Sequence, residues 1–218
     1  MPGPLFSQQI RETTFVVVDF ETVTPKGRPP EPLEFAAMRL GPGLIPDPTF
    51  RFSQLVRPPD DAPLTTFDTQ QTGIREKDIA DAPDAFTILH QFDECLGQEL
   101  PLLVAHNARY EAAIFQRFVT CCPQAATLSF LDTVALGKHL APGLANYKLD
   151  TLAQHFHLLI PANRHRALPD VELTIQVLQH LLSGYLEKAP QATIVDLLRI
   201  GGIKPPPAPE EPVQISLW

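Results

Sequence analysis

The sequence predicts an α/β domain in which helices cover both faces of a mixed β-sheet. Three strand-like segments come first, and strands and helices alternate afterwards, which is the order expected of such a sheet. The chain has 218 residues, 44% of them hydrophobic, which is enough for one domain with a full core. After residue 202 the composition becomes proline-rich, so we expect a domain at 1–202 and a disordered, extended tail at 203–218.

The first three strands are expected at 14–20, 33–40 and 49–56. The first contains the apolar run 15–18, whose β-branched residues favour a strand that is buried on both faces. Residues 41–48 are rich in glycine and proline and are expected to form a turn. Short links between the three strands favour an antiparallel meander.

Residues 57–83 show little periodicity and are expected to form a loop with short helical turns. After them, apolar residues at helical spacing predict a helix over 84–96 with Asp84 as its N-cap. Asp132 is expected to cap a later helix in the same way. Further strands are predicted at 102–105 and 126–131, and further helices at 108–119, 132–140, 149–157, 166–182 and 192–200.

Composition restricts the classes of function. A net charge of −8 argues against a protein that coats nucleic acid, but it is compatible with a nuclease whose acidic site is bridged to phosphate by metal ions. Three cysteines without a metal-binding spacing are interpreted as reduced structural thiols. With neither a signal-like N-terminus nor an apolar stretch of about 20 residues, we expect a soluble cytoplasmic protein with no membrane partner.

Two carboxylates, Asp19 and Glu21, stand at the C-terminal end of the first predicted strand. Residues i and i+2 of a strand point the same way, so both should face one spot at an edge where α/β sheets bind ligands. Two converging acids repel each other unless a cation lies between them, and carboxylates are preferred ligands of Mg²⁺ and Mn²⁺. Taken alone, the pair is better explained by two solvated surface acids.

Two later segments carry further candidate residues. In 104–111 a strand ends, a polar turn follows and a helix begins, with Glu111 as either a capping acid or a metal ligand in its first turn. In 165–170, Pro169 suits a first helical turn, which puts His165 before the helix and Asp170 at its start. A single histidine is more often structural than catalytic, so neither segment is decisive by itself.

In combination, the three segments are specific. Asp-x-Glu at 19–21, His-Asn-Ala-x-Tyr-acid at 106–111 and His-x-Ala-x-x-Asp at 165–170 resemble the DEDDh class of 3′–5′ exonucleases. This DnaQ-like family includes the epsilon proofreading subunit of bacterial DNA polymerase III, and the resemblance covers residues 14–182. It implies a ribonuclease H-like fold and removal of nucleoside 5′-monophosphates from single-stranded DNA 3′ ends, in proofreading or repair.

The resemblance also implies roles for individual residues. Two divalent metal ions, Mg²⁺ or Mn²⁺, would be held by Asp19, Glu21 and Asp170 with help from Glu111. His165 would be the general base, because histidine can accept the proton of an attacking water near neutral pH. The candidate substrate-binding residues are Phe20, Thr22 and Asn107, although a core position for Phe20 is nearly as well supported.

The tail ends on the peptide Gln214, Ile215, Ser216, Leu217 and Trp218. An exposed Leu-Trp end is unfavourable for solubility unless something receives it, so the peptide either folds back on the domain or is a linear motif. It resembles the Gln-Leu-Ser/Asp-Leu-Phe peptide that binds the bacterial sliding clamp. A clamp tether would raise the local concentration of the nuclease at DNA, and a DNA polymerase is a further expected partner.

One position departs from the family pattern. The usual residue at 111 is Asp, and Glu carries the carboxylate one methylene further from the backbone. A displacement of about 1 Å can cost on the order of 10²-fold in rate, yet a longer side chain can also reach its metal. An active enzyme is favoured because every other site residue is present. The alternative is a catalytically weakened adaptor that binds DNA ends and the clamp.

A second alternative is an exoribonuclease, because nothing in the sequence reads the 2′-hydroxyl group that separates RNA from DNA. The sequence offers no obvious basic track for a long nucleic acid. Four basic residues near the motifs are interpreted as solvated surface charges rather than as a basic rim of the site: Arg109, Lys148, Arg164 and Arg166.

Overall fold

The computed structural model describes residues 8–98 and 100–204. Its strands are β1 (Phe15–Val23), β2 (Glu31–Gly41), β3 (Ile45–Leu55), β4 (Leu102–Ala105), β5 (Phe130–Asp132) and β6 (Gly202–Ile203). Its α-helices are α1 (Thr66–Thr72), α2 (Glu76–Ile79), α3 (Ala85–Leu96), α4 (Arg109–Arg117), α5 (Pro123–Thr127), α6 (Thr133–Leu140), α7 (Leu149–His155), α8 (Ala167–Lys188) and α9 (Ile194–Gly201). Short 3-10 helices lie at Ile10–Glu12 and Pro42–Leu44.

The six strands form one mixed sheet in the order β3-β2-β1-β4-β5-β6. β1 pairs antiparallel with β2 and parallel with β4. β2 and β3 continue the predicted antiparallel meander, while β4 and β5 are parallel. The antiparallel and parallel parts of the sheet therefore meet at β1, the strand that carries the first motif.

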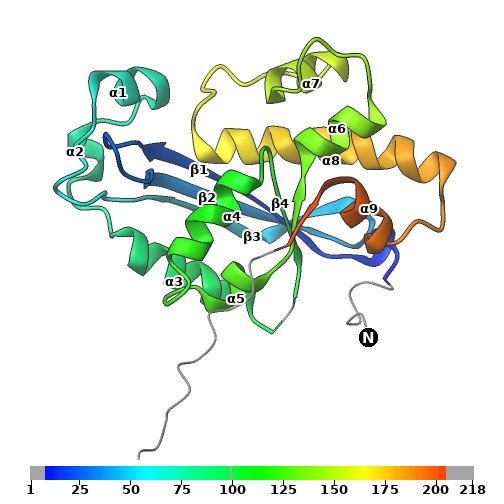
Figure 1. Ribbon diagram of the computed structural model, residues 1–218, viewed down its shortest axis with the longest axis horizontal. Coiled ribbons are helices and arrows are strands. Elements are labelled where there is room, and N and C mark those ends of the chain that lie inside the picture. Colours follow the sequence, from blue (N-terminus) through cyan, green and yellow to red (C-terminus); the bar gives the residue numbers. More distant parts are fainter. Residues whose placement is uncertain (1–7, 99, 205–218) are drawn as a thin grey trace, which may run out of the picture.

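Helices cover both faces of the sheet, which confirms the predicted α/β class (Figure 1). On one face, α3, α4 and α5 pack over a core that includes Val16 and Val18 of β1. On the other face, α6, α7, α8 and α9 pack over Phe15 and Val17. The alternating side chains of β1 thus enter two separate cores, as the apolar run at its start predicts.

Strand boundaries differ from the prediction at two places. β3 begins at Ile45, so most of the expected turn at 41–48 is strand. The strand lies at the edge of the sheet, where Pro46 and Pro48 are tolerated because edge backbone groups need no partner. β1 continues to Val23 through a register shift after Glu21.

The predicted strand at 126–131 is wrong in its first half. Pro123 begins α5 instead, since proline suits a first helical turn, and strand β5 covers only Phe130–Asp132. β6 was not predicted. Ile203, which the sequence places in the tail, pairs with Phe130.

Several local predictions are confirmed. Asp84 caps α3 by accepting a 2.8 Å hydrogen bond from the Thr87 backbone, and Asp132 caps α6 at 2.9 Å from Val134. The region 57–83 contains the short helices α1 and α2. α8 is longer than expected and ends at Lys188.

The three cysteines are free, as predicted; two are buried, whereas Cys95 is exposed. Within the described residues, no helix has both the length and the apolar character needed to cross a membrane. The clamp-like peptide at 214–218 lies outside the described residues.

Candidate active site

The end of β1 places two acids on one side of the sheet. Phe15 and Val17 pack toward α8, whereas Val18 packs toward α4, so strand alternation directs Asp19 and Glu21 to the α8 side. Glu21 is only 9% exposed and Asp19 is partly buried. Both carboxylates lie on the same side of the sheet, as their spacing predicts, and they are not the solvated pair that the alternative required.

The start of α8 brings the third motif to the same place. Ligand atoms of Glu21, His165 and Asp170 all lie within 4.8 Å of one another. Asp170 is buried in the first turn of α8. His165 precedes that turn, is exposed and has a backbone φ of 64°. The structure thus assembles residues from the first and third motifs into one group.

Glu111 lies in the first turn of α4 and is 3% exposed. Its Oε2 atom has no hydrogen-bond partner among the described residues, and no side chain caps α4. A buried carboxylate oxygen without a partner is unfavourable unless a ligand satisfies it. This observation favours the metal-ligand interpretation of Glu111 over the capping one.

Burial raises the pKa values of these acids. The pKa of Glu21 is raised to about 7, mainly by burial and then by the charge of Glu34. Burial raises the pKa of Glu111 to about 8, and it raises that of Asp19 well above its usual range with the help of Glu111 and Glu21. Crowded oxygen donors of this kind fit a hard divalent cation such as Mg²⁺ or Mn²⁺.

Two arginines next to His165 also belong to the site. Arg164 forms ion pairs with Asp170 and, at 2.6 Å, with Asp150. Its positive charge partly offsets the rise in the pKa values of Asp19 and Glu21. The interpretation of Arg164 as a solvated surface charge is therefore wrong.

Arg166 is the second correction, because it forms two hydrogen bonds of 2.7 and 2.8 Å with the buried carboxylate of Glu34. The sequence indicates that Glu34 needs some partner, because it is a lone acid between Leu33 and Phe35 in an apolar strand, but it does not indicate which residue. The other two basic residues of that group, Arg109 and Lys148, are exposed as predicted.

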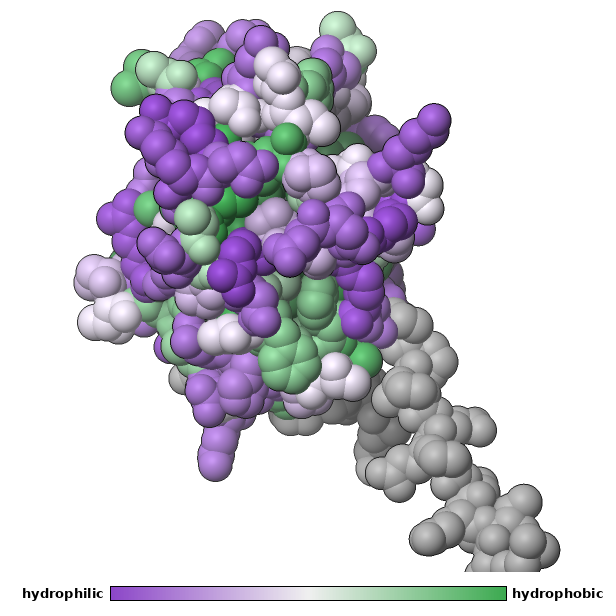
Figure 2. Space-filling model, turned by 90° about the vertical axis from the view of Figure 1, so that its left-hand side faces the viewer, coloured by the Kyte–Doolittle hydropathy of each residue, from purple (hydrophilic) through white to green (hydrophobic). Residues whose placement is uncertain are grey.

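A cavity of about 410 Å³ adjoins Glu21. Phe20, Glu21 and Thr22 line one side of it and α1 lines the other, where Phe67 is 69% exposed. The Thr22 hydroxyl lies 2.6 Å from the Tyr110 hydroxyl, which also faces the cavity. Figure 2 shows the end of the molecule that carries α1 and α2, where mostly hydrophilic side chains surround small apolar areas.

The candidate substrate residues behave differently. Phe20 is 6% exposed and stacks on Phe35 with ring centres 4.4 Å apart, so it is mainly a core residue. Asn107 is exposed, and its backbone has φ 71° and donates a 3.1 Å hydrogen bond to Asp132. Its neighbour His106 is held by Thr133 at 2.9 Å, and burial lowers the pKa of His106 to about 4.

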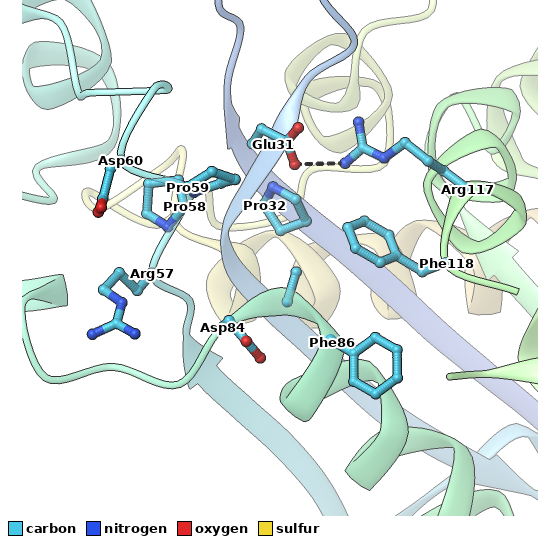
Figure 3. A pocket seen from close by; sticks show the side chains of 11 residues that line it. Glu31, Pro32, Arg57, Pro58, Pro59, Asp60, Asp84, Phe86, Arg117 and Phe118 are labelled. Carbon is cyan, nitrogen blue, oxygen red and sulfur yellow. Dashed lines mark hydrogen bonds and ion pairs between the residues drawn. The ribbon is translucent and has the colours of Figure 1, made fainter. Parts of the chain in front are cut away.

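A second cavity, of about 560 Å³, lies between the start of β2 and the adjoining ends of α3 and α4 (Figure 3). Its lining includes prolines and the exposed ring of Phe86. Two of its acids have partners, since Glu31 pairs with Arg117 at 2.9 Å and Asp84 caps α3. It therefore lacks the group of neighbouring acids and a histidine that distinguishes the cluster at β1.

The chain matches the Exonuclease family (RNase_T) over residues 16–178. A DNA polymerase III PolC-type protein of Oceanobacillus iheyensis is 32% identical over 182 residues, which cover 83% of this chain and 12% of the relative. The PolC-type protein of Bacillus subtilis is 30% identical over 186 residues, 84% of this chain and 12% of the relative. The chain thus spans about one eighth of the length of these relatives.

Solved structures share the fold at low identity. Exonuclease X in complex with 5′ overhanging duplex DNA is 23% identical with a TM-score of 0.63, covering 85% of this chain and 98% of that one. The nuclease domain of 3′hExo, a DEDDh family member bound to rAMP, is 16% identical with a TM-score of 0.65, covering 81% and 94%. E. coli Exonuclease I with a dT13 oligonucleotide has a TM-score of 0.69 at 18% identity, covering 82% and 43%. These likenesses confirm the predicted ribonuclease H-like fold.

Proposed function

The chain belongs to the Exonuclease family, and from that premise we propose that it is a metal-dependent 3′–5′ exonuclease acting on single-stranded DNA ends. The observation that carries the proposal is the group formed by Glu21, His165 and Asp170, whose ligand atoms lie within 4.8 Å of one another. Glu21 and Asp170 are buried, and buried acids that gather with a histidine are candidates for a catalytic or ligand site. PolC-type DNA polymerases among the relatives favour DNA as substrate.

The acids would hold two divalent ions, Mg²⁺ or Mn²⁺. Their ligands would be Asp19, Glu21 and Asp170, with the unpartnered Oε2 atom of Glu111 as a further donor. When bound, such ions neutralise the phosphate oxygens, acidify the attacking water and stabilise the leaving oxygen.

His165 would accept the proton of the attacking water. It is exposed and adjoins the acids, so a water approaching the scissile phosphate can reach its ring. The cavity beside Glu21 would receive the terminal nucleotide, with Thr22 and Tyr110 on its wall. Asn107, in the turn before α4, would be a further contact of the nucleotide. Hydrolysis of the last phosphodiester bond at the 3′ end would release a nucleoside 5′-monophosphate.

The test is degradation of a 5′-labelled single-stranded DNA oligonucleotide with Mg²⁺ or Mn²⁺, beside an RNA of the same sequence. We expect a metal-dependent ladder that shortens from the 3′ end and is stronger on DNA. Asp170→Asn is the matched control, because it removes one acid of the group and should abolish the ladder. Preferential cleavage of the RNA would contradict DNA as the substrate and would favour an exoribonuclease instead.

A second candidate function is a DNA-end-binding adaptor with weakened catalysis, favoured by Glu in place of the family's usual Asp at 111. Wild-type protein and Glu111→Asp should be assayed together. If Glu111→Asp cleaves the oligonucleotide and the wild type does not, glutamate at position 111 has switched the enzyme off.

The peptide at 214–218 would tether the nuclease to a sliding clamp. Leu217 and Trp218 would fill an apolar pocket of the clamp, and Gln214 would supply hydrogen bonds. Even weak binding of this kind would raise the local concentration of the nuclease at DNA. Deleting the peptide should leave cleavage of free oligonucleotides unchanged and remove binding to purified clamp in surface plasmon resonance. Equal clamp binding by the shortened chain would refute the tether.

A further inference from the structure

We propose that Glu34 is a positioning residue, which acts through Arg166 to fix His165 beside the site acids. This inference rests on the proposed exonuclease function, because it assigns His165 its role there. Glu34 lies on β2 directly opposite Glu21 of β1 and is 4% exposed. It is therefore a buried acid in the immediate neighbourhood of the reaction that no motif includes.

Both oxygens of the Glu34 carboxylate accept hydrogen bonds from residues that directly follow His165. Oε1 accepts a 2.7 Å hydrogen bond from Arg166, and Oε2 accepts 2.8 Å from Arg166 and 2.9 Å from the backbone N–H of Ala167. The bidentate Arg–carboxylate pair has a fixed geometry, and the backbone bond caps the start of α8. One side chain of the sheet thus sets where α8 begins.

His165 depends on such external support. Its φ of 64° is unfavourable for a residue with a Cβ atom and persists where neighbours impose it. Among the described residues, none hydrogen-bonds to its ring. Its position follows from its two neighbours: Arg164 is held by Asp150 and Asp170, and Arg166 is held by Glu34.

Glu34 is distinct from the metal-binding acids. Both of its oxygens accept hydrogen bonds from the α8 turn, whereas Glu111 keeps an oxygen without a partner. Glu34→Gln removes the charge and the bidentate pair while keeping the size of the side chain. This variant should therefore misplace His165 without removing a metal ligand.

The decisive experiment is a double-mutant cycle of Glu34→Gln and His165→Ala on a 5′-labelled DNA oligonucleotide. We expect Glu34→Gln to lower kcat by about 10- to 100-fold, as a misplacement near 1 Å does, with KM changed less than about threefold. In the His165→Ala background the same change should have no further effect on kcat. An equal loss in both backgrounds would show that Glu34 acts on something other than His165.

Arg51→Gln is the matched control. It breaks the 2.9 Å ion pair between Arg51 of β3 and Glu172, which also joins the sheet to α8 but lies away from the His165 turn. Its kcat should equal that of the wild type. A loss as large as that of Glu34→Gln would mean that any link between sheet and α8 has this effect, and would overturn a specific role for Glu34.

A measurement without metal or substrate separates this inference from the proposed function. In NMR spectra of the imidazole groups, Glu34→Gln should move the His165 signal toward the random-coil position and leave that of His157 unchanged. An unchanged His165 signal would refute positioning even in an active enzyme. If the wild type cleaves neither DNA nor RNA, the proposed function fails, and the NMR result alone decides whether Glu34 fixes His165.

Discussion

The two halves of the candidate active site are held by different means. Asp19 and Glu21 lie on the central strand β1, whose backbone pairs with β2 from Phe15 to Val23, with a register shift only after Glu21. His165 sits in an exposed turn with a left-handed backbone, held by ion pairs of its neighbours. The half that would bind metal is thus fixed by the sheet, and the half that would move a proton is fixed by side chains.

This difference has an energetic side. In the strand half, Asp19 and Glu21 have raised pKa values, chiefly because burial disfavours the charged carboxylate and then because neighbouring acids repel it. The turn half carries the compensating cations, with Arg164 paired to Asp170 and Arg166 paired to Glu34. Changes in the strand half should alter metal binding and pH response, whereas changes in the turn half should alter turnover.

The largest expected effect comes from the turn. His165→Ala should lower kcat by about 10²- to 10⁴-fold, the usual contribution of a general base, while Mn²⁺ affinity stays the same because the acids remain. Single-turnover assays and calorimetric Mn²⁺ titration measure the two quantities. His157→Ala is the control, since His157 also has a positive φ, 55°, but lies outside the site. Near-normal turnover of His165→Ala would show that the turn half does not move the proton, and would contradict the role proposed for it.

A change at Glu111 of α4 tests whether this acid binds metal together with the acids of the strand half. Glu111→Gln removes a charge and should weaken Mn²⁺ binding and lower kcat, by about 10²-fold if the carboxylate contacts metal. Glu111→Asp keeps the charge but withdraws it by one methylene, so its loss should be smaller. Calorimetry on the variants gives the affinities, and unchanged affinity in Glu111→Gln would return Glu111 to a structural role.

The smallest expected effect is on the stability of the metal-free protein. The pKa values of Glu21 and Glu111 are raised from 4.5 to about 7 and about 8, so the fold holds their protons more tightly than the unfolded chain does. Stability should therefore fall as pH rises from about 4.5 to about 8. Urea unfolding in EDTA across this range measures it. The decline should be shallower in Glu111→Gln and largely reversed by Mn²⁺, and a stability that rises with pH would contradict the assignment.

The features that the sequence revealed are those with local or motif-level signals. Asp84 and Asp132 were recognisable as caps because a cap needs only its own helix. The proximity of Glu21, His165 and Asp170 was predictable because three motifs occur together in one order. For Glu111 the sequence allows two interpretations, and its unpartnered oxygen favours the proposed role of metal ligand.

The features that escaped prediction depend on contacts between distant segments. Glu34 and Arg166 are 132 positions apart, and nothing around either residue specifies the other. The two-residue strand β6 exists only because β5 offers it an edge, so its own residues carry no strand signal. Arg164 was misjudged for the same reason, since a charge near a motif gives no indication of which acid it will meet.

The order of the site residues along the chain has a consequence for synthesis. Asp19 and Glu21 leave the ribosome early, whereas His165, Arg166 and Asp170 follow more than a hundred residues later, and they meet the acids only when α8 docks on the sheet. A nascent or truncated chain that lacks α8 has the β1 carboxylates but no histidine beside them. The proposed catalytic group is therefore completed only after α8 has been synthesised and has packed on the sheet.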